Sequence, residues 1–190
     1  MNRFKQLGLV ILVYWLCIGS VLAEKNFNQN EYQAKIVILN NKNYYTSLIH
    51  EIKRAKTSIH ISMYLFKMTK NPKNPIVIIV NELIKARKRG VFVKVLLEKS
   101  GFNKGLNEEN QQVARKLRQN KISVCFDSLK TQTHTKIIII DSQLSFVGSH
   151  NLTASALSWN NELSVLVKSK PMAKKILQNL KTIKGNRCFQ

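Results

Sequence analysis

The sequence predicts an α/β protein in which a mixed β-sheet is sandwiched between helices. Segments rich in branched and aromatic residues alternate with segments of helical periodicity, and the strands cluster late in the chain, an order typical of α/β folds. Four consecutive isoleucines, residues 137–140, indicate a strand covered on both faces, because only such a strand tolerates an uninterrupted apolar run. The length of 190 residues fits a single domain with a substantial core.

The N-terminal segment is typical of a targeting sequence. It has a basic start, an almost wholly apolar stretch at residues 7–22, and small-to-medium residues before the first acid. This pattern predicts a cleaved secretory signal at residues 1–23 and a secreted or periplasmic protein. The alternative is an uncleaved membrane anchor, because the apolar stretch lies between typical signal and transmembrane lengths. A linker at residues 24–34 and a single domain at residues 35–190 follow.

The domain begins with alternating strands and a helix. Residues 36–39 are apolar, and residues 35–39 predict the first strand. Residues 44–56 place apolar side chains on one face of a helix, and residues 58–66 alternate as a second strand does. Residues 67–74 carry lysines and a proline, and we expect them to form a loop that contacts the substrate.

A second helix and a third strand come next. Pro75 suits the first turn of a helix, and Gly90 ends that helix after Arg89. Residues 91–98 predict a strand. Residues 99–107 contain two glycines and predict a flexible loop.

The C-terminal half completes the sheet. Residues 108–120 predict a helix with acids in its first turn, where the helix dipole favours them. Strands are then expected at residues 122–126, 134–141, 144–148 and 161–167, with a short turn at 142–143 and a final helix at 171–183.

Two polar residues mark the start of the isoleucine strand. His134 and Lys136 project to the same side, because side chains alternate along a strand with period two. A nucleophile or base beside a cation suits an anionic substrate, and phosphate is the obvious candidate. Asp141 lies at odd parity to both residues, so we expect it to face away from them.

Residues 134–151 read His-x-Lys-x4-Asp-x6-Gly-Ser-x-Asn, which resembles the complete signature of the phospholipase D superfamily. The similarity extends over roughly residues 35–183, where the order of strands and helices also resembles that family. The chain is most similar to small bacterial members with a single motif, which include secreted nucleases and phospholipase D proteins.

The resemblance implies a phosphodiesterase that works through a covalent phosphohistidine, without metal or cofactor. His134, Lys136 and Asp141 would be the catalytic motif residues. His134 would attack phosphorus as a neutral imidazole, and Lys136 would stabilise the charge of the transition state. Asp141 would support the site rather than bind phosphate.

The resemblance also implies roles for three residues after the isoleucine strand. Asn151, together with Ser149, would donate hydrogen bonds to the phosphoryl oxygens. Glu162 would hold the second ring nitrogen of the histidine and thereby fix its tautomer.

The mechanism needs a nucleophile and a separate acid, because one imidazole cannot easily attack phosphorus and protonate the opposite oxygen. The chain contains one His-x-Lys motif. We therefore predict a twofold homodimer in which each subunit contributes His134, Lys136 and Asn151 to one shared site.

The charge points to a polyanionic partner. The chain has 31 Lys and Arg against 10 Asp and Glu, a net charge of +21, which attracts nucleic acid or an anionic membrane surface. We interpret the protein as an endonuclease acting on DNA or RNA. One alternative is a phospholipase D that binds phosphatidylcholine membranes and hydrolyses their lipids to phosphatidic acid, and another is a catalytically silent polyanion-binding module.

The remaining histidines and cysteines receive structural interpretations. His50, His60 and His150 are not predicted to be catalytic. Cys125 and Cys188 have no zinc-site spacing. In an oxidising compartment they could pair with each other, or Cys188 could bridge two chains.

Overall fold

A computed structural model describes residues 31–185 and 188–189, so the predicted signal or anchor lies outside the described residues. The linker expected at residues 24–34 lies mostly outside them as well, and residues 31–34 form neither helix nor strand. The elements follow in the order β1 (Lys35–Asn40), α2 (Lys42–Arg54), β2 (Ser58–Met63), α3 (Pro75–Lys88), β3 (Phe92–Leu97), α4 (Lys104–Gln119), β4 (Ser123–Phe126), β5 (Lys136–Ile140), β6 (Leu144–Gly148), α5 (Ala154–Ser158), β7 (Leu163–Lys168) and α6 (Lys170–Lys181).

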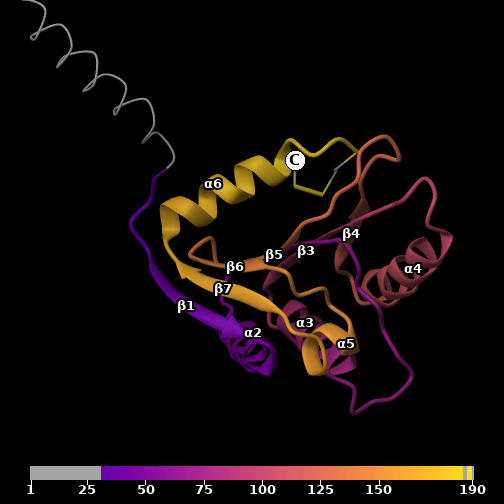
Figure 1. The fold of residues 1–190 in the computed structure, drawn as a ribbon, viewed down its shortest axis with the longest axis horizontal. Helices are drawn as coiled ribbons and strands as arrows, with labels where there is room; N and C mark the ends of the chain where they lie inside the picture. The colour runs from indigo at the N-terminus through magenta and orange to yellow at the C-terminus, as the bar shows by residue number, and fades with distance from the viewer. Residues whose placement is uncertain (1–30, 186–187, 190) are drawn as a thin grey trace, which may run out of the picture. The chain divides into compact units, whose positions relative to one another are not determined.

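The strands of the described chain form one seven-stranded sheet in the order β1-β7-β6-β5-β2-β3-β4 (Figure 1). The neighbours β2, β3 and β4 are parallel. The pairs β1–β7, β7–β6, β6–β5 and β5–β2 are antiparallel. The sheet is therefore mixed, which confirms the predicted α/β fold class.

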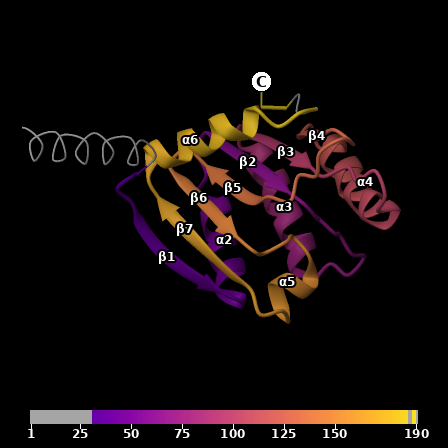
Figure 2. The ribbon, with the colours of Figure 1, turned by 45° about the horizontal axis from the view of Figure 1, so that its top comes forward.

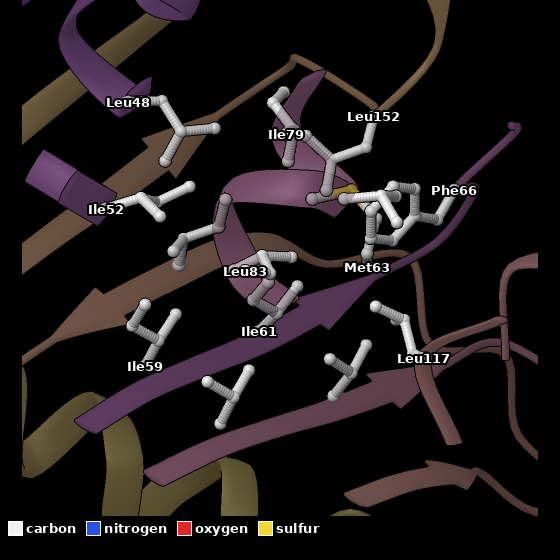
Figure 3. Close-up of a cluster of buried hydrophobic side chains, with 14 of the residues drawn as sticks. Leu48, Ile52, Ile59, Ile61, Met63, Phe66, Ile79, Leu83, Leu117 and Leu152 are labelled. Atoms are coloured by element: carbon white, nitrogen blue, oxygen red, sulfur yellow. The ribbon is translucent and has the colours of Figure 1, made fainter. Parts of the chain in front are cut away.

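Helices cover both faces of the sheet. Helix α6 lies along one face, and the other helices lie toward the opposite face (Figure 2). Figure 3 shows Leu48 and Ile52 of α2 with Ile79 and Leu83 of α3, packed against Ile61 of β2. Burial of such side chains contributes about 1.5–3 kcal/mol each, so this larger cluster is the main stabilising core.

The isoleucine run contributes to both cores. Ile138 and Ile140 belong to the larger cluster, whereas Ile139 packs with Ala173 and Leu180 of α6. All three isoleucines are at most 1% exposed. The prediction of a strand covered on both faces is confirmed.

The start of α4 was predicted wrongly. The helix begins at Lys104, inside the segment expected to be a flexible loop. The Asn103 side chain accepts a hydrogen bond from the Leu106 backbone N–H at 3.0 Å and caps the helix there. As a result, the acids expected in the first turn lie one turn further on.

Two other elements differ from the prediction by more than two residues. Strand β2 ends at Met63 rather than at residue 66, and Phe66 instead forms an isolated bridge with Leu152. Helix α5 was not predicted because it is only five residues long. The hydroxyl of Thr153 caps it by accepting the Ala156 N–H at 3.1 Å.

Cys125 of β4 and Cys188 form a disulfide, with a Cα–Cα distance of 5.7 Å. This pairing decides between the two alternatives left open by the sequence. The bond fixes the end of the described chain to β4. No helix in the described ranges has the length and apolar character needed to span a membrane.

Candidate active site

The candidate site lies where β5 begins and β2 ends. Lys136 is the first residue of β5 and pairs with Met63, the last residue of β2. The antiparallel pairing continues beyond the strands, since the Tyr64 N–H donates to the Thr135 carbonyl at 2.9 Å. His134 therefore sits two residues before β5, and its side chain is exposed.

His134 and Lys136 lie together, as the parity of a strand predicts. The Lys136 ammonium nitrogen is 3.3 Å from each ring nitrogen of His134. It also donates to the His134 carbonyl oxygen at 3.0 Å. This bond fixes the position of the ammonium group beside the imidazole.

The Tyr64 ring contacts both the His134 imidazole and the Lys136 ammonium group. The sequence did not reveal this role. The Tyr64 ring meets the His134 ring at an angle of 62°, with centroids 4.4 Å apart. The Lys136 ammonium nitrogen lies 4.9 Å from the centroid of the same ring, in a cation–π contact. Tyr64 comes from beyond β2, so only the sheet pairing shows that it belongs to the site.

The environment favours a neutral imidazole. Burial, and then the charge of Lys136, hold the pKa of His134 below its ordinary value of 6.5. Burial also lowers the pKa of Lys136, and the nearby Glu162 carboxylate opposes that shift. A neutral imidazole with a free lone pair is able to act as a nucleophile near neutral pH.

Asn151 approaches the site from the loop after β6. Its side-chain oxygen accepts the Leu65 N–H at 3.3 Å, so its NH₂ group is the end that can donate to an anion. Gly148 allows the end of β6 to lie close to β7. A Cβ at this position would overlap both the backbone and the side chain of Ser164 on β7. The close approach of β6 and β7 therefore requires a glycine there.

Ser149 and Glu162 bind each other. The Ser149 hydroxyl donates to one Glu162 carboxylate oxygen and accepts the Leu163 N–H at 3.1 Å. The other Glu162 oxygen accepts a bond from Asn160 at 3.0 Å. Among the described residues, Glu162 thus accepts bonds from Ser149 and Asn160, and its charge acts on Lys136.

The contacts of Asp141 lie at the other end of β5 from His134 and Lys136. Asp141 follows β5 at the end opposite Lys136. Its carboxylate accepts the backbone N–H groups of Lys56, Thr57 and Ser58, at 2.8–3.2 Å, where β2 begins. These hydrogen bonds lower its pKa, although burial opposes them. Asp141 therefore holds the far end of the sheet.

His150 has a structural environment, in line with its interpretation from the sequence. It is 1% exposed and stacks on Tyr44 with ring centroids 4.2 Å apart. Its Nε2 contacts the Asn41 carbonyl at 3.2 Å, and its Nδ1 contacts the Ser164 hydroxyl at 2.7 Å. His50 is exposed on α2.

His60 lies on β2, where its ring packs against Phe189. Burial lowers its pKa to about 4, and Lys94 and Lys181 add to this effect. Like His50, it has no role in the candidate site.

Asn110 is a further residue that the sequence did not reveal. It is fully buried on α4, and its side chain bonds Phe66 N–H, Tyr64 carbonyl and Glu98 carbonyl at 2.9–3.0 Å. It therefore joins the ends of β2 and β3 beneath the site. Within the described ranges, no three His, Cys, Asp or Glu side chains gather as a metal site.

A hollow of about 380 Å³ lies away from His134. It is lined by Arg87, Lys88, Gln119, Asn120 and Lys121. These residues end α3 and α4 and precede β3 and β4, whereas His134 lies near the other ends of those strands. The hollow is thus separate from the candidate site.

Comparison with known families decides the assignment. A family model described as "Cardiolipin synthase, PLD-like domain" matches residues 48–184, which is well over half of the chain. The chain belongs to the phospholipase D superfamily. A Rickettsia prowazekii protein named phospholipase D is 31% identical over 132 residues, which cover 70% of this chain and 58% of the relative. The match thus spans less than two thirds of that relative's length.

Solved structures of this superfamily share the fold. Nuc from Salmonella typhimurium, a phospholipase D family member, matches with a TM-score of 0.63 and 24% identity, covering 78% of this chain and 93% of its own. NucT from Helicobacter pylori matches with a TM-score of 0.63 and 20% identity, covering 81% and 100%. The protein therefore has the phosphodiesterase-type fold of the phospholipase D superfamily.

Proposed function

We propose that this protein is a metal-independent endonuclease that hydrolyses phosphodiester bonds in DNA or RNA through a phosphohistidine. The observation that carries the proposal is the contact between the exposed His134 ring and the Lys136 ammonium group at the end of the sheet. It supplies a neutral nucleophile and a cation at one point, which is the pair that attack on a phosphodiester requires.

In the proposed first step, a His134 ring nitrogen attacks phosphorus and the bond from phosphorus to the leaving oxygen breaks. A protonated second histidine gives its proton to that oxygen. Lys136 and the Asn151 amide bind the phosphoryl oxygens as charge builds up on them. In the second step, water attacks phosphorus, the N–P bond breaks, and the second histidine accepts the proton of the water.

The second histidine is proposed to come from another copy of the chain. A face of β1 and β7 supports this homodimer, because it exposes large apolar side chains. Ile36, Ile38 and Leu163 are 61%, 69% and 59% exposed, and the strand register places them on one face of the sheet. Leu163 follows Glu162, whose charge acts on Lys136, so this apolar face reaches toward the candidate site.

Nucleic acid is the proposed substrate because of the net charge of +21, which favours binding to a polyanion. Trp159 supports the same choice. It is 78% exposed beside Asn160, which bonds Glu162, and an exposed aromatic ring can stack on an unpaired base.

The test is cleavage of plasmid DNA by the purified protein in EDTA, followed by detection of label transferred from labelled DNA to the protein. The protein is denatured in alkali for this step, because the N–P bond of a phosphohistidine survives base and is hydrolysed in acid. His134→Ala should lose at least about 10³-fold in rate, as loss of a nucleophile does in other enzymes. His50→Ala, at an exposed position on α2, is the matched control and should stay fully active. Cleavage retained in His134→Ala, or abolished by EDTA, would refute the mechanism.

A phospholipase D acting on phosphatidylcholine is the second candidate. The Rickettsia relatives named phospholipase D, at 30–32% identity, favour it. Choline release from phosphatidylcholine vesicles, measured beside the DNA assay, separates the two substrates. DNA binding without either reaction would instead indicate a silent polyanion-binding module.

A secreted or periplasmic location is part of the proposal. The Cys125–Cys188 disulfide supports it, because disulfides persist in oxidising compartments.

A further inference from the structure

Two buried carboxyl groups lie beneath the segment that carries His134. Glu98 follows the last residue of β3, and Asp127 follows the last residue of β4. The two strands are parallel neighbours with Leu97 opposite Phe126, so the two acids are adjacent. Glu98 is 1% exposed and Asp127 is 6% exposed. Burial of an ionised acid without a cation partner lowers the free energy of unfolding.

Both acids bind one backbone N–H group. Thr133 N–H donates to Glu98 Oε2 and to Asp127 Oδ2, the latter at 3.0 Å. Asp127 Oδ1 also accepts the Lys99 N–H at 2.7 Å. Because both carboxyl groups accept the same Thr133 N–H, they lie within reach of each other. A bond between two carboxyl groups requires a proton on one of them.

His134 is thereby held between two anchors. Thr133, on its N-terminal side, is held by the acid pair. Thr135, on its other side, is held by β2, through its carbonyl to Tyr64 N–H and through its hydroxyl to Ser62. Loss of the first anchor would release one side of the proposed nucleophile.

Few charges near the pair can compensate for its ionisation. Helix α4 contributes the neutral Asn110, which bonds the Glu98 carbonyl, and its neighbour Glu109 pairs with Lys67 at 2.8 Å. From β4 the titratable group is Asp127 itself, and the loop before β5 carries Lys130 and His134, both of which are exposed. Lys99 contacts the pair through its backbone N–H.

We propose that Glu98 and Asp127 are positioning residues that share one proton, clamp Thr133 in that state and hold His134 in its attacking position. Loss of the proton places two negative charges side by side in a buried site. Their repulsion opens the clamp and frees the segment before His134. This role rests on the proposed function, because it acts through the proposed nucleophile.

The expected pH range follows from the environment of Glu98. Burial and then the hydrogen bond with Asp127 raise the pKa of Glu98 from 4.5 to about 7. A carboxyl group whose pKa is raised by folding adds stability that is fully present below its unfolded pKa. That stability is lost as the pH rises through about 7, and the clamp should open in the same range.

The test is Glu98→Gln, because a glutamine amide can donate to Asp127 and accept the Thr133 N–H without titrating. At pH 6 the variant and the wild type should have similar kcat. At pH 8 a group with a pKa of about 7 keeps its proton in about a tenth of the molecules, so the variant should be up to about tenfold faster. The loss of kcat at alkaline pH that remains in Glu98→Gln arises from deprotonation of the second histidine, which protonates the leaving oxygen.

Thermal unfolding gives a second readout that needs no activity. The Tm of the wild type should fall relative to that of Glu98→Gln between pH 5 and pH 8. Glu82→Gln is the matched control, because Glu82 is also buried but bonds Lys85 on α3. This control should keep the wild-type dependence on pH. Should Glu98→Gln fail to fold, Glu98→Met is the second variant, because it also removes the titrating group and leaves the Thr133 and Lys99 N–H groups bonded to Asp127.

Superimposable pH profiles of wild type and Glu98→Gln, in both kcat and Tm, would overturn the proposal. A protein without phosphodiesterase activity but with the expected difference in Tm would refute the proposed function and leave the shared proton established. A difference in Tm with identical kcat profiles would show that the pair shares a proton but does not position His134, which also overturns the proposal.

Discussion

At the scale of single residues, the candidate site depends on how Lys136 changes the imidazole beside it. The ammonium group contacts both ring nitrogens of His134. It therefore disfavours a second positive charge on the ring. One side chain thus has two proposed tasks, since it keeps the nucleophile neutral and binds the phosphoryl group.

Lys136→Met should reveal both tasks. The acid limb of kcat/KM should move upward toward pH 6.5, because one of the two causes that lower the pKa of His134 is removed. The maximum of kcat/KM should fall by about 10²–10³-fold, as it does when a group that stabilises transition-state charge is lost. A pH–rate profile measures both effects.

Lys94→Met is the matched control, because Lys94 contacts the Phe92 ring on β3 rather than His134. It should leave the acid limb in place. An acid limb that stays unchanged in Lys136→Met would contradict the electrostatic coupling between Lys136 and His134.

The sequence made some of these residues predictable and others not. His134 and Lys136 are two positions apart on a strand, so local parity places them together. Tyr64 and Asn110 enter the site through pairing between distant segments. No local pattern marks such residues, because their role depends on which strands become neighbours.

At the scale of elements, the two ends of β5 have different tasks. The first end carries Lys136 and is proposed to be catalytic. The last end carries Asp141, whose carboxylate joins the turn after β5 to the segment before β2. Sequence spacing placed Asp141 in the motif, but a strand of five residues separates it from the site by about 16 Å.

Asp141→Asn should therefore affect stability rather than chemistry. Hydrogen bonds to a charged group are worth about 1.5–3 kcal/mol, and partial solvent exposure reduces this, so we expect a loss of about 1–2 kcal/mol in the free energy of unfolding. Urea denaturation measures the loss, and kcat should stay within about twofold. Glu108→Gln, at an exposed position on α4, should change neither quantity.

The same variant has a defined pH dependence. The pKa of Asp141 is lowered in the fold, so its stabilising effect is present above its unfolded pKa of 3.8 and is lost as the pH falls below that value. The stability difference between wild type and Asp141→Asn should shrink in acid. A large drop in kcat at pH 7 would restore Asp141 to the catalytic residues.

Most element boundaries were predictable within two residues, and the exceptions have physical causes. Helix α4 begins early because the Asn103 side chain caps it, a contact that Asn can form in many loops. Helix α5 was missed because five residues give too little periodicity to detect.

At the scale of the whole molecule, the disulfide is a major constraint on the chain. It closes a sequence separation of 63 residues between Cys125 and Cys188. Loop-closure entropy predicts about 4 kcal/mol of stabilisation for such a loop. The pairing could not be deduced from spacing alone, because two cysteines can also bond between chains.

Replacement of both cysteines by serine should lower the free energy of unfolding by about 2–4 kcal/mol. Urea denaturation of the oxidised wild type and of the variant measures this difference. Reduction of the wild type should give the same loss. Equal stability of the oxidised and reduced wild type would show that the bond does not constrain the chain in solution.

The proposed dimer links the fold to the function. The apolar face of β1 and β7 is expected to bury its exposed side chains against a second copy, which would supply the proton-donating histidine. Ile38→Asp places a charge in that face without touching the candidate site, because Ile38 lies on the edge strand β1. The variant should sediment as a monomer and lose about 10²-fold or more in kcat.

Phe92→Asp is the matched control. Phe92 is 52% exposed on β3, toward the other edge of the sheet, and its replacement should leave both the dimer and kcat unchanged. Analytical ultracentrifugation and DNA cleavage on the same samples decide the matter. A wild-type monomer with full activity at micromolar concentration would show that one chain contains every group that the reaction needs. The proposal of a shared site would then be wrong, even if His134 remains the nucleophile.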